Sequence, residues 1–306
     1  MNPTSVSVVI CTYNRNGPLE RLLLALVAVS ASASSVADIG VVIVDDDADG
    51  GARVIADRFA ESFALGVRYE RSGLRNISVA RNKALAAGIE MADWVAMIDD
   101  DCLPVDEWIV ALIEVQRRTD ADAVTGSCPT PAPPNAPSWL TSQPFLTDAV
   151  NGVDGQEPEF GATKNTMIRS RWLVDHPEIR FERSLGRLGG EDTVFFYRAR
   201  DAGLVHRFSA AASVAEMVPA ERTTFRYNVR TRYWYGNSQY VTTMVAGRAT
   251  RRRWALRGSR RMWEALVSPI WRIAHGRAPQ WRWATAEVAC AAGMLAGLVG
   301  IRVNHH

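Results

Sequence analysis

Three consecutive carboxylates, Asp99, Asp100 and Asp101, follow a short apolar run and precede Pro104. Neighbouring acids repel one another, and core packing does not require them. A hard divalent cation compensates for such a cluster, because Mg²⁺ and Mn²⁺ bind carboxylate oxygen and often share it with a substrate diphosphate. If the apolar run is a strand, side-chain alternation places Asp99 and Asp101 on the same side. We therefore predict a metal site here, with a solvated acidic turn as the alternative.

A second acid cluster, Asp45 to Asp47, follows the apolar run at 41–44. Ligands of open α/β sheets bind beyond the carboxyl ends of the strands, so two strands that end in acids indicate one polar site. A carboxylate there can accept hydrogen bonds from a base or a ribose. A dinucleotide-binding half-domain would require Gly-x-Gly-x-x-Gly after the first strand, and residues 12–17 do not supply it.

Strands that alternate with helices must position these acids. Such an alternation predicts an α/β protein with a largely parallel sheet and right-handed crossovers. From β-branched runs and helical spacing of apolar residues we expect strands at 6–11, 41–44, 67–70, 94–98 and 121–126, and helices at 18–27, 51–63, 77–91 and 106–117.

Composition narrows the class of protein. The 306 residues are 47% hydrophobic, so the chain can build a full core as one large domain or two smaller ones. The four cysteines lie far apart without a Cys-x-x-Cys pair, which indicates neither a disulfide framework nor a zinc site and favours a reducing cytosol. We see no signal peptide at the start of the chain.

The small net charge of +2 conceals an asymmetry. From Arg248 onward, eleven arginines face only Glu264 and Glu287, a net charge of +9 that leaves the first 247 residues at −7. A basic tail on an acidic body indicates a partner with negative charge, either membrane lipid or nucleic acid. The tail contains no recognised nucleic-acid-binding module, so we predict no nucleic acid partner.

Five blocks of sequence resemble, in this order, the family 2 glycosyltransferases of GT-A fold. The similarity extends from about residue 5 to about residue 240. The block Asn76–Leu85 is most similar to bacterial exopolysaccharide transferases of the kind that extend the succinoglycan repeat. The five blocks are residues 6–15, 42–46, 76–85, 98–101 and 189–192.

This resemblance implies a Rossmann-like, mostly parallel sheet with flanking helices. It also implies inverting transfer of a sugar from a nucleotide diphosphate donor, usually a UDP-sugar, with Mn²⁺ or Mg²⁺. Thr12 and Tyr13 could instead shape a turn, and Arg81 could be a solvated helix residue. By position, the residues implied to bind the nucleotide sugar are Thr12, Tyr13, Asn14, Arg15, Asp46, Asn76, Arg81, Asp99, Asp100 and Arg232.

Inverting transfer requires a general base on the face opposite the leaving group. The resemblance assigns that role to Asp192, with Glu191 as an orienting or acceptor-binding neighbour. Acids in the first turn of a helix are also favoured by its dipole, which is the structural alternative. The resemblance implies a metal ligand at Asp101 and places Asp99 near the ribose, while the acid cluster makes Asp99 a second candidate ligand. Glu216, where many relatives carry a histidine that assists the metal, is a third candidate or a strand-end carboxylate paired with arginine.

Six prolines at 129–144 predict a connector. Residues 160–168 are expected to form a return strand. Its Lys164 and Asn165 could contact sugar or phosphate, or they could be plain surface residues. We therefore divide the chain into a nucleotide-sugar-binding half (1–128), an acceptor-binding and catalytic half (129–247) and a helical, partly amphipathic tail (248–306).

The tail combines tryptophan and arginine with an amphipathic helix through Pro269, which favours the interfacial layer of a membrane. The apolar run 284–301 is the shortest credible span. Its content of alanine and glycine makes us prefer a peripheral or re-entrant helix to a crossing. Core packing and a homodimer contact remain alternatives.

These observations favour a metal-dependent inverting glycosyltransferase at the cytoplasmic face of the bacterial inner membrane. It would add a sugar to a glycan or polyprenyl-linked acceptor in surface polysaccharide biosynthesis. A sugar nucleotidyltransferase is a second hypothesis, but it would require a glycine-rich, basic loop near the first strand, which is not present. A non-catalytic nucleotide- or glycan-binding protein is a third, and it would not need the base Asp192.

Overall fold

The computed structural model describes residues 3–146, 152–159 and 161–304. The chain divides into two compact units, which are treated separately. The first comprises Met1–Thr130, Asp148–Gly186 and Glu191–Met217, and the second Pro131–Thr147, Arg187–Gly190 and Val218–His306. The connector rich in proline therefore belongs largely to the second unit together with the C-terminal helices.

The first unit is built on a mixed, mostly parallel sheet. Strands β1, β2, β3 and β4 are parallel neighbours, β7 is antiparallel to both β4 and β6, and β6 is parallel to β8. The α/β expectation is confirmed. Among the described residues seven strands follow the order β3-β2-β1-β4-β7-β6-β8. Their bounds are β1 Thr4–Thr12, β2 Ala37–Asp45, β3 Val67–Arg71, β4 Trp94–Asp99, β6 Ala123–Gly126, β7 Thr166–Arg169 and β8 His206–Ser209.

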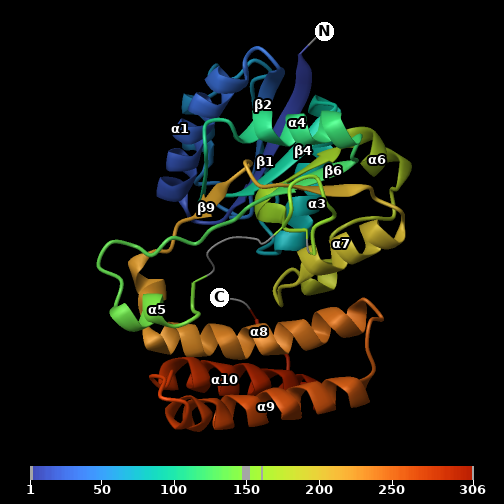
Figure 1. Cartoon of the computed structure of the whole chain (residues 1–306). Coiled ribbons are helices and arrows are strands. Elements are labelled where there is room, and N and C mark those ends of the chain that lie inside the picture. Colours follow the sequence, from blue (N-terminus) through green and yellow to red (C-terminus); the bar gives the residue numbers. More distant parts are fainter. Residues whose placement is uncertain (1–2, 147–151, 160, 305–306) are drawn as a thin grey trace. The chain divides into compact units, whose positions relative to one another are not determined.

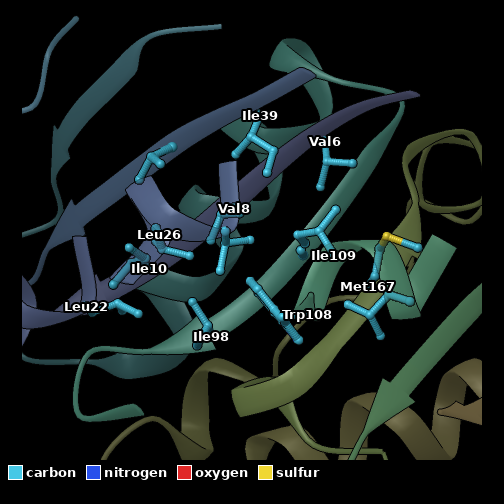
Figure 2. Close-up of a cluster of buried hydrophobic side chains, with 14 of the residues drawn as sticks. Val6, Val8, Ile10, Leu22, Leu26, Ile39, Ile98, Trp108, Ile109 and Met167 are labelled. Atoms are coloured by element: carbon cyan, nitrogen blue, oxygen red, sulfur yellow. The ribbon is translucent and has the colours of Figure 1, made fainter. Parts of the chain in front are cut away.

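Helices cover both faces of this sheet (Figure 1). Side chains alternate along each strand, so Val8 and Ile10 pack under α1 and α4, whereas Val9 packs under α3 on the other face. Figure 2 shows the first cluster, where Leu22 and Trp108 meet strand residues such as Ile98. Burial on both faces explains the nearly continuous apolar strands. The helices are α1 Asn16–Ala33, α2 Arg53–Arg58, α3 Ile77–Met91, α4 Trp108–Thr119, α6 Ser170–Asp175 and α7 Glu191–Asp201.

A two-stranded antiparallel ribbon joins the acid cluster to a distant part of the chain. Strand β5 (Cys102–Pro104) pairs with β9 (Val214–Glu216), and Cys102 lies opposite Glu216. The backbone amide of Met217 also donates to the carbonyl oxygen of Asp101 at 2.9 Å. Glu216 is thereby placed beside the end of the three acids. The 3-10 turns of this unit are η1 Thr163–Asn165 and η2 Arg183–Leu185; Phe160 of the expected return strand lies outside the described residues.

The second unit consists mainly of helices. In it, α10 (Trp281–Leu298) packs against both α8 (Phe225–Val245) and α9 (Arg251–Ala274). The remaining elements are α5 (Ser138–Ser142) and η3 (Ala220–Thr223). The predicted amphipathic helix is confirmed, because α9 continues through Pro269.

The small residues of α10 serve close helix packing. A Cβ atom added to Gly293 would lie 2.0 Å from the carbonyl oxygen of Tyr233, and one added to Gly236 would lie 2.0 Å from that of Cys290. Of the interpretations offered for 284–301, packing within the protein is the one seen for its helical part, because α10 packs against α8 and α9. The predicted peripheral membrane contact stays a prediction. Within residues 3–146, 152–159 and 161–304, no helix has both the length and the apolar character needed to cross a bilayer.

Aromatic side chains anchor the proline-rich connector within the second unit. The ring of Trp139 lies 5.1 Å from that of Phe145 and 5.7 Å from that of Phe225. Phe145 in turn lies 5.2 Å from Trp283 of α10, and all three pairs meet edge to face. Gln143 accepts a hydrogen bond from the backbone amide of Trp283 at 2.8 Å. These contacts explain how a segment that can form neither a long helix nor a central strand is held in place.

Candidate active site

The carboxyl ends of β1, β2 and β4 meet at one edge of the sheet. The strand register places Cys11 beside Asp99 and Thr12 beside Asp45. Residues that are far apart in sequence thus converge where ligands of parallel sheets bind. The two acid clusters, one after β2 and one after β4, both lie at this edge, on either side of β1.

Asp100 points inward and ties this edge together. Its carboxylate accepts a hydrogen bond from the Thr12 hydroxyl at 2.8 Å and pairs with the Arg15 guanidinium at 2.9 Å. The same Arg15 nitrogen lies 2.9 Å from Asp101. Burial raises the pKa of Asp100 to about 6, although Arg15 and Thr12 oppose that shift. The side chains of Asp99 and Asp101 are more exposed than that of Asp100. Strand β4 ends at Asp99 and a turn follows, so side-chain alternation along a strand does not apply to Asp100 and Asp101.

In the second acid cluster, hydrogen bonds hold the carboxylates of Asp45 and Asp46 at the loop that follows β2. Asp45 accepts hydrogen bonds from the amides of Asp47 and Ala52 and from the Tyr69 hydroxyl. Asp46 is also buried, and its Oδ1 accepts from the Ser72 hydroxyl at 2.5 Å and from the amide of Leu74 at 3.2 Å. These bonds fix the loop that follows β2 and hold one carboxylate oxygen of Asp46 within it.

A ring from the loop after β1 stacks with a guanidinium from the loop before α3. Asn14 adopts a left-handed conformation with φ of 53° and is exposed. Arg75, which is also left-handed at φ of 49°, places its guanidinium 5.1 Å above the ring of Tyr13. This stacked pair lies at the entrance to α3, where Asn76 caps the helix by accepting from the amide of Val79. Arg75 was not singled out from the sequence.

Arg81 connects the end of β4 with the start of α7. One guanidinium nitrogen lies 3.1 Å from Asp99 Oδ1, and the other pairs with Glu191 Oε1. The Arg81 side chain is only 13% exposed, so it is not the solvated helix residue of the alternative interpretation. Burial disfavours the charged guanidinium, but the carboxylates of Asp99 and Glu191 outweigh it and raise the pKa of Arg81.

Glu191 is a buried carboxyl with one oxygen unsatisfied. Burial raises its pKa to about 7, which Arg81 opposes and the nearby charge of Asp192 reinforces. Its second oxygen, Oε2, has no hydrogen-bond partner among the described residues. A pocket beside the Arg81–Asp99 pair is lined by Cys11 and Thr163.

Asp192 occupies the first turn of α7 and is half-buried. Its Oδ1 accepts a hydrogen bond from the Thr193 amide at 2.7 Å, as expected for an acid at a helix start. Its charge acts on both Arg81 and Glu191. The structure therefore brings Asp192 into the electrostatic neighbourhood of the Asp99 end of β4. Cys11, in the same neighbourhood, is not an available nucleophile, because burial raises the pKa of its thiol to about 12.

Glu216 pairs with a lysine rather than with an arginine. Lys164 Nζ lies 2.9 Å from Glu216 Oε2, and both side chains are less than one-third exposed. Burial acts against the charged lysine, but Glu216 outweighs it and raises the lysine pKa. Neighbouring Asn165 is fully buried and hydrogen-bonds Trp108 and two backbone carbonyls, so it does not face a ligand.

The donor set fits a metal ion that is shared with a substrate. No group of three or more His, Cys, Asp or Glu side chains among the described residues is arranged to hold a metal. Asp99, Asp101 and Glu216 contact Arg81, Arg15 and Lys164 respectively. Mg²⁺ and similar ions are commonly bound by one or two carboxylates plus phosphate oxygens and water, for which these hard oxygen donors are suitable. They do not form an all-protein cage.

Arg232 belongs to the second unit. Its guanidinium lies 4.2 Å above the ring of Trp283 and 3.5 Å from Glu287, which also pairs with Arg261 at 2.7 Å. Burial lowers the pKa of Arg232, while Glu287 opposes that shift. These contacts link the three long helices of its unit. Nothing in them tests the predicted role near the donor diphosphate.

The mostly parallel sheet, its flanking helices and its acid-lined carboxyl edge are those of a GT-A fold. The chain belongs to glycosyl transferase family 2, whose sequence model matches residues 7–176. The match covers the four parallel strands and their acids. The resemblance noted from the sequence blocks is confirmed.

Relatives of known name extend the similarity to most of the chain. The succinoglycan biosynthesis protein ExoM of Rhizobium meliloti (strain 1021) is 29% identical over 299 residues, 97% of this chain and 94% of ExoM. Mannosyltransferase PcManGT from Pyrobaculum calidifontis, solved with GDP-Man and Mn²⁺, superposes with a TM-score of 0.62 at 16% identity. That match covers 97% of this chain and 88% of PcManGT.

S. aureus TarS has a similar fold. Its crystal structure matches with a TM-score of 0.55 at 14% identity, over 78% of this chain but only 43% of the TarS chain. TarS 1–349 in complex with UDP-GlcNAc also has a TM-score of 0.55, at 13% identity, over 80% of this chain and 72% of that one. At these identities the solved structures establish the fold alone.

Proposed function

We propose that this glycosyltransferase moves a sugar from a nucleotide diphosphate sugar, a UDP-sugar by preference, to a glycan or polyprenyl-linked acceptor in exopolysaccharide biosynthesis. The proposed transfer is inverting and depends on Mn²⁺ or Mg²⁺. Similarity to ExoM along nearly the whole chain supports the exopolysaccharide role. The complexes of fold relatives with UDP-GlcNAc and with GDP-Man support a nucleotide sugar donor.

The observation that carries the proposal is the bridge made by Arg81. It joins Asp99, at the end of the strand that precedes the acid cluster, to Glu191, the neighbour of Asp192. This contact supports a single site in which the proposed donor side and the proposed base act together. A nucleotide-binding protein without catalysis has no need to hold a helix-start carboxylate against that edge.

In the proposed reaction, Asp192 accepts the proton of the attacking acceptor hydroxyl. The hydroxyl oxygen forms a bond to the anomeric carbon while the bond from that carbon to the phosphate oxygen breaks. The electron pair leaves with the nucleoside diphosphate, and the configuration at the anomeric carbon inverts. Arg81 holds Glu191 in place, so that the start of α7 and Asp192 on it stay oriented toward the sheet edge.

Asp101 and Asp99 are the residues proposed to hold the metal, with Glu216 available when Lys164 turns away. A bound divalent cation would supply stabilisation of the negative charge that develops on the leaving diphosphate. Thr12 and Arg15 position the acids by fixing Asp100. Tyr13, stacked under Arg75, is proposed to border the nucleoside, together with Asn14, Asp46 and Asn76.

A screen of UDP- and GDP-sugars tests this function. With Mn²⁺ or Mg²⁺ present, one donor should raise the melting temperature and be slowly hydrolysed, and hydrolysis should stop when the metal is chelated. The product formed with an acceptor should have the anomeric configuration opposite to that of the donor. Release of pyrophosphate from a nucleoside triphosphate and a sugar phosphate would instead identify a nucleotidyltransferase. Donor binding without any turnover would identify a binding protein.

The proposed setting is the cytoplasmic face of the inner membrane, which the tail touches peripherally. The distribution of charge supports this setting, because eleven arginines lie in the last 59 residues. An acceptor carried on a polyprenyl lipid would be presented at the same surface. A homodimer through the tail is the competing use of that region.

A further inference from the structure

Helix α9 exposes a stripe of large apolar side chains. The members of this α9 stripe follow one another at intervals of seven, three, four and three residues, which keeps them on one face of the helix. More than half of each side chain is open to solvent. The exposed fractions are Leu256 64%, Trp263 67%, Leu266 57%, Ile270 64% and Ile273 53%.

A different face of α9 makes the packing contacts. Trp254, Gly258, Ala265 and Pro269 are buried, and the helix packs against α10. The α9 stripe is therefore not a part of the core of its own unit. Large apolar side chains scattered singly on a surface are normal, but five in one line on one helix mark an interaction site.

Positive charge surrounds this stripe. Arg252, Arg253, Arg257 and Arg260 are exposed on α9. The only acid in the α9 sequence is Glu264, which pairs with Arg260 at 2.7 Å. Further exposed arginines and tryptophans flank the end of α9 and the start of α10, namely Trp271, Arg277, Trp281 and Arg282.

This chemistry selects among possible occupants. Nucleic acid would match the charge but has no use for a stripe of leucine and isoleucine on a helix. A second copy of the chain would match the apolar side chains but would bring two sets of arginines together. The surface of an anionic bilayer matches both, because tryptophan and aliphatic side chains enter the interfacial layer while arginines meet the lipid phosphates.

We infer that the α9 stripe and its arginines form the membrane-docking face, with α9 lying in the interfacial plane of an anionic bilayer. The inference rests on the proposed function, because docking through α9 would bring the enzyme to a lipid-linked acceptor. It assigns the contact to α9 and not to α10, which packs against both α8 and α9.

Vesicle flotation with the full chain tests the docking face. The protein should float with vesicles made of equal parts of phosphatidylcholine and phosphatidylglycerol, and much less with phosphatidylcholine alone. Each arginine near such a surface is worth about a fivefold change in affinity, so Arg252→Glu with Arg253→Glu should weaken binding about 25-fold or more. Trp263→Ser with Ile270→Ser should weaken it about 100-fold, because two large apolar contacts are lost.

The matched control is Leu24→Ser with Val54→Ser, which removes two side chains that are 59% and 61% exposed on α1 and α2. This control should bind vesicles like the wild type. Asp192→Asn should also bind them normally, so a failure of the catalytic proposal leaves vesicle binding intact. Equal loss in the control and in the stripe variant would overturn the docking face, as would equal binding to both kinds of vesicle.

Two further results would reassign the face. Tight binding to DNA or RNA that the arginine pair controls, without vesicle binding, would replace the membrane by nucleic acid. A dimer that Trp263→Ser with Ile270→Ser converts to a monomer, again without vesicle binding, would replace it by a second copy. Retained donor hydrolysis in the stripe variant would show that its loss of docking is not a loss of folding.

Discussion

Replacement of Arg81 by methionine tests the bridge on which the active-site proposal depends. The variant keeps an apolar stem but leaves Glu191 and Asp99 without their shared cation. Glu191 matters more, because its side chain is 7% exposed whereas that of Asp99 is 36% exposed and can be solvated. Removal of one partner from a buried ion pair costs about 3–5 kcal/mol unless the remaining group changes its protonation.

Glu191 can change its protonation, which makes the cost depend on pH. Its pKa in the folded protein, about 7, exceeds the ordinary value of 4.5, so the folded state binds more protons than the unfolded state between these values. Stability should therefore fall as pH rises through that window. Without Arg81 the pKa of Glu191 in the folded variant rises further. Above pH 7, each pH unit then widens the difference in unfolding free energy between wild type and variant by about 1.4 kcal/mol. We expect a loss of about 1 kcal/mol at pH 6 and about 3 kcal/mol at pH 8.5.

Urea unfolding of the wild type and the variant at both pH values measures this difference. Arg81→Met combined with Glu191→Gln should remove most of the pH dependence, since the group that titrates is gone. Arg171→Met is the matched control, because Arg171 makes an exposed pair with Asp175 on one helix and should cost less than about 0.5 kcal/mol at either pH. A loss from Arg81→Met that is the same at pH 6 and pH 8.5 would refute the reasoning.

Three further perturbations each follow from one local feature. Burial lowers the pKa of His206 to about 3, so the free energy of unfolding should fall as pH drops below about 6.5. In urea titrations His206→Gln should flatten that fall, and an unchanged slope would contradict this. Gly293→Ala should lower the free energy of unfolding by about 3 kcal/mol or more in urea titrations, because the added methyl group would lie 2.0 Å from a backbone carbonyl oxygen. A neutral result would contradict the close packing of α8 and α10. In electron paramagnetic resonance titrations with Mn²⁺ and UDP, Asp101→Asn should weaken metal binding more than Glu216→Gln, since Asp101 belongs to the same acid cluster as the other proposed ligand, Asp99. The reverse order would make Glu216 the principal ligand.

Much of the sheet could be predicted from sequence because its signals are local. Strands β1, β2 and β4 are apolar runs that end in polar or acidic residues, and burial on both faces leaves that pattern unmistakable. The sheet edge itself follows from the rule that parallel strands end together.

The partners within the site could not be predicted, because they depend on distant segments. Arg81 meets Glu191 across 110 residues, and Lys164 meets Glu216 across 52. Sequence spacing does not say that a helix residue at 81 is buried between two acids. The expectation that Glu216 could pair with arginine failed for the same reason, since Glu216 on β9 meets Lys164 of η1, which is distant in sequence.

The apolar run at the C-terminus shows a different limit. Alanine and glycine in an eighteen-residue stretch are compatible with a weak membrane helix and with a helix packed at close range. Only the positions of α8 and α9 reveal the close packing, because Gly293 lies against the backbone of α8 and Gly258 of α9 packs near Leu295. The exposed stripe on α9 was partly visible as periodicity, but its exposure was not.

The most direct test of the central claim is the activity of Asp192→Asn. With the donor found in the screen, this variant should bind the nucleotide sugar and metal like the wild type while transfer to acceptor falls by a factor of at least about 100. Asp201→Asn, at the far end of the same helix, should retain full transfer. Near-normal turnover by Asp192→Asn would contradict the assignment of the base, and loss of donor binding together with turnover would place Asp192 in the donor site instead.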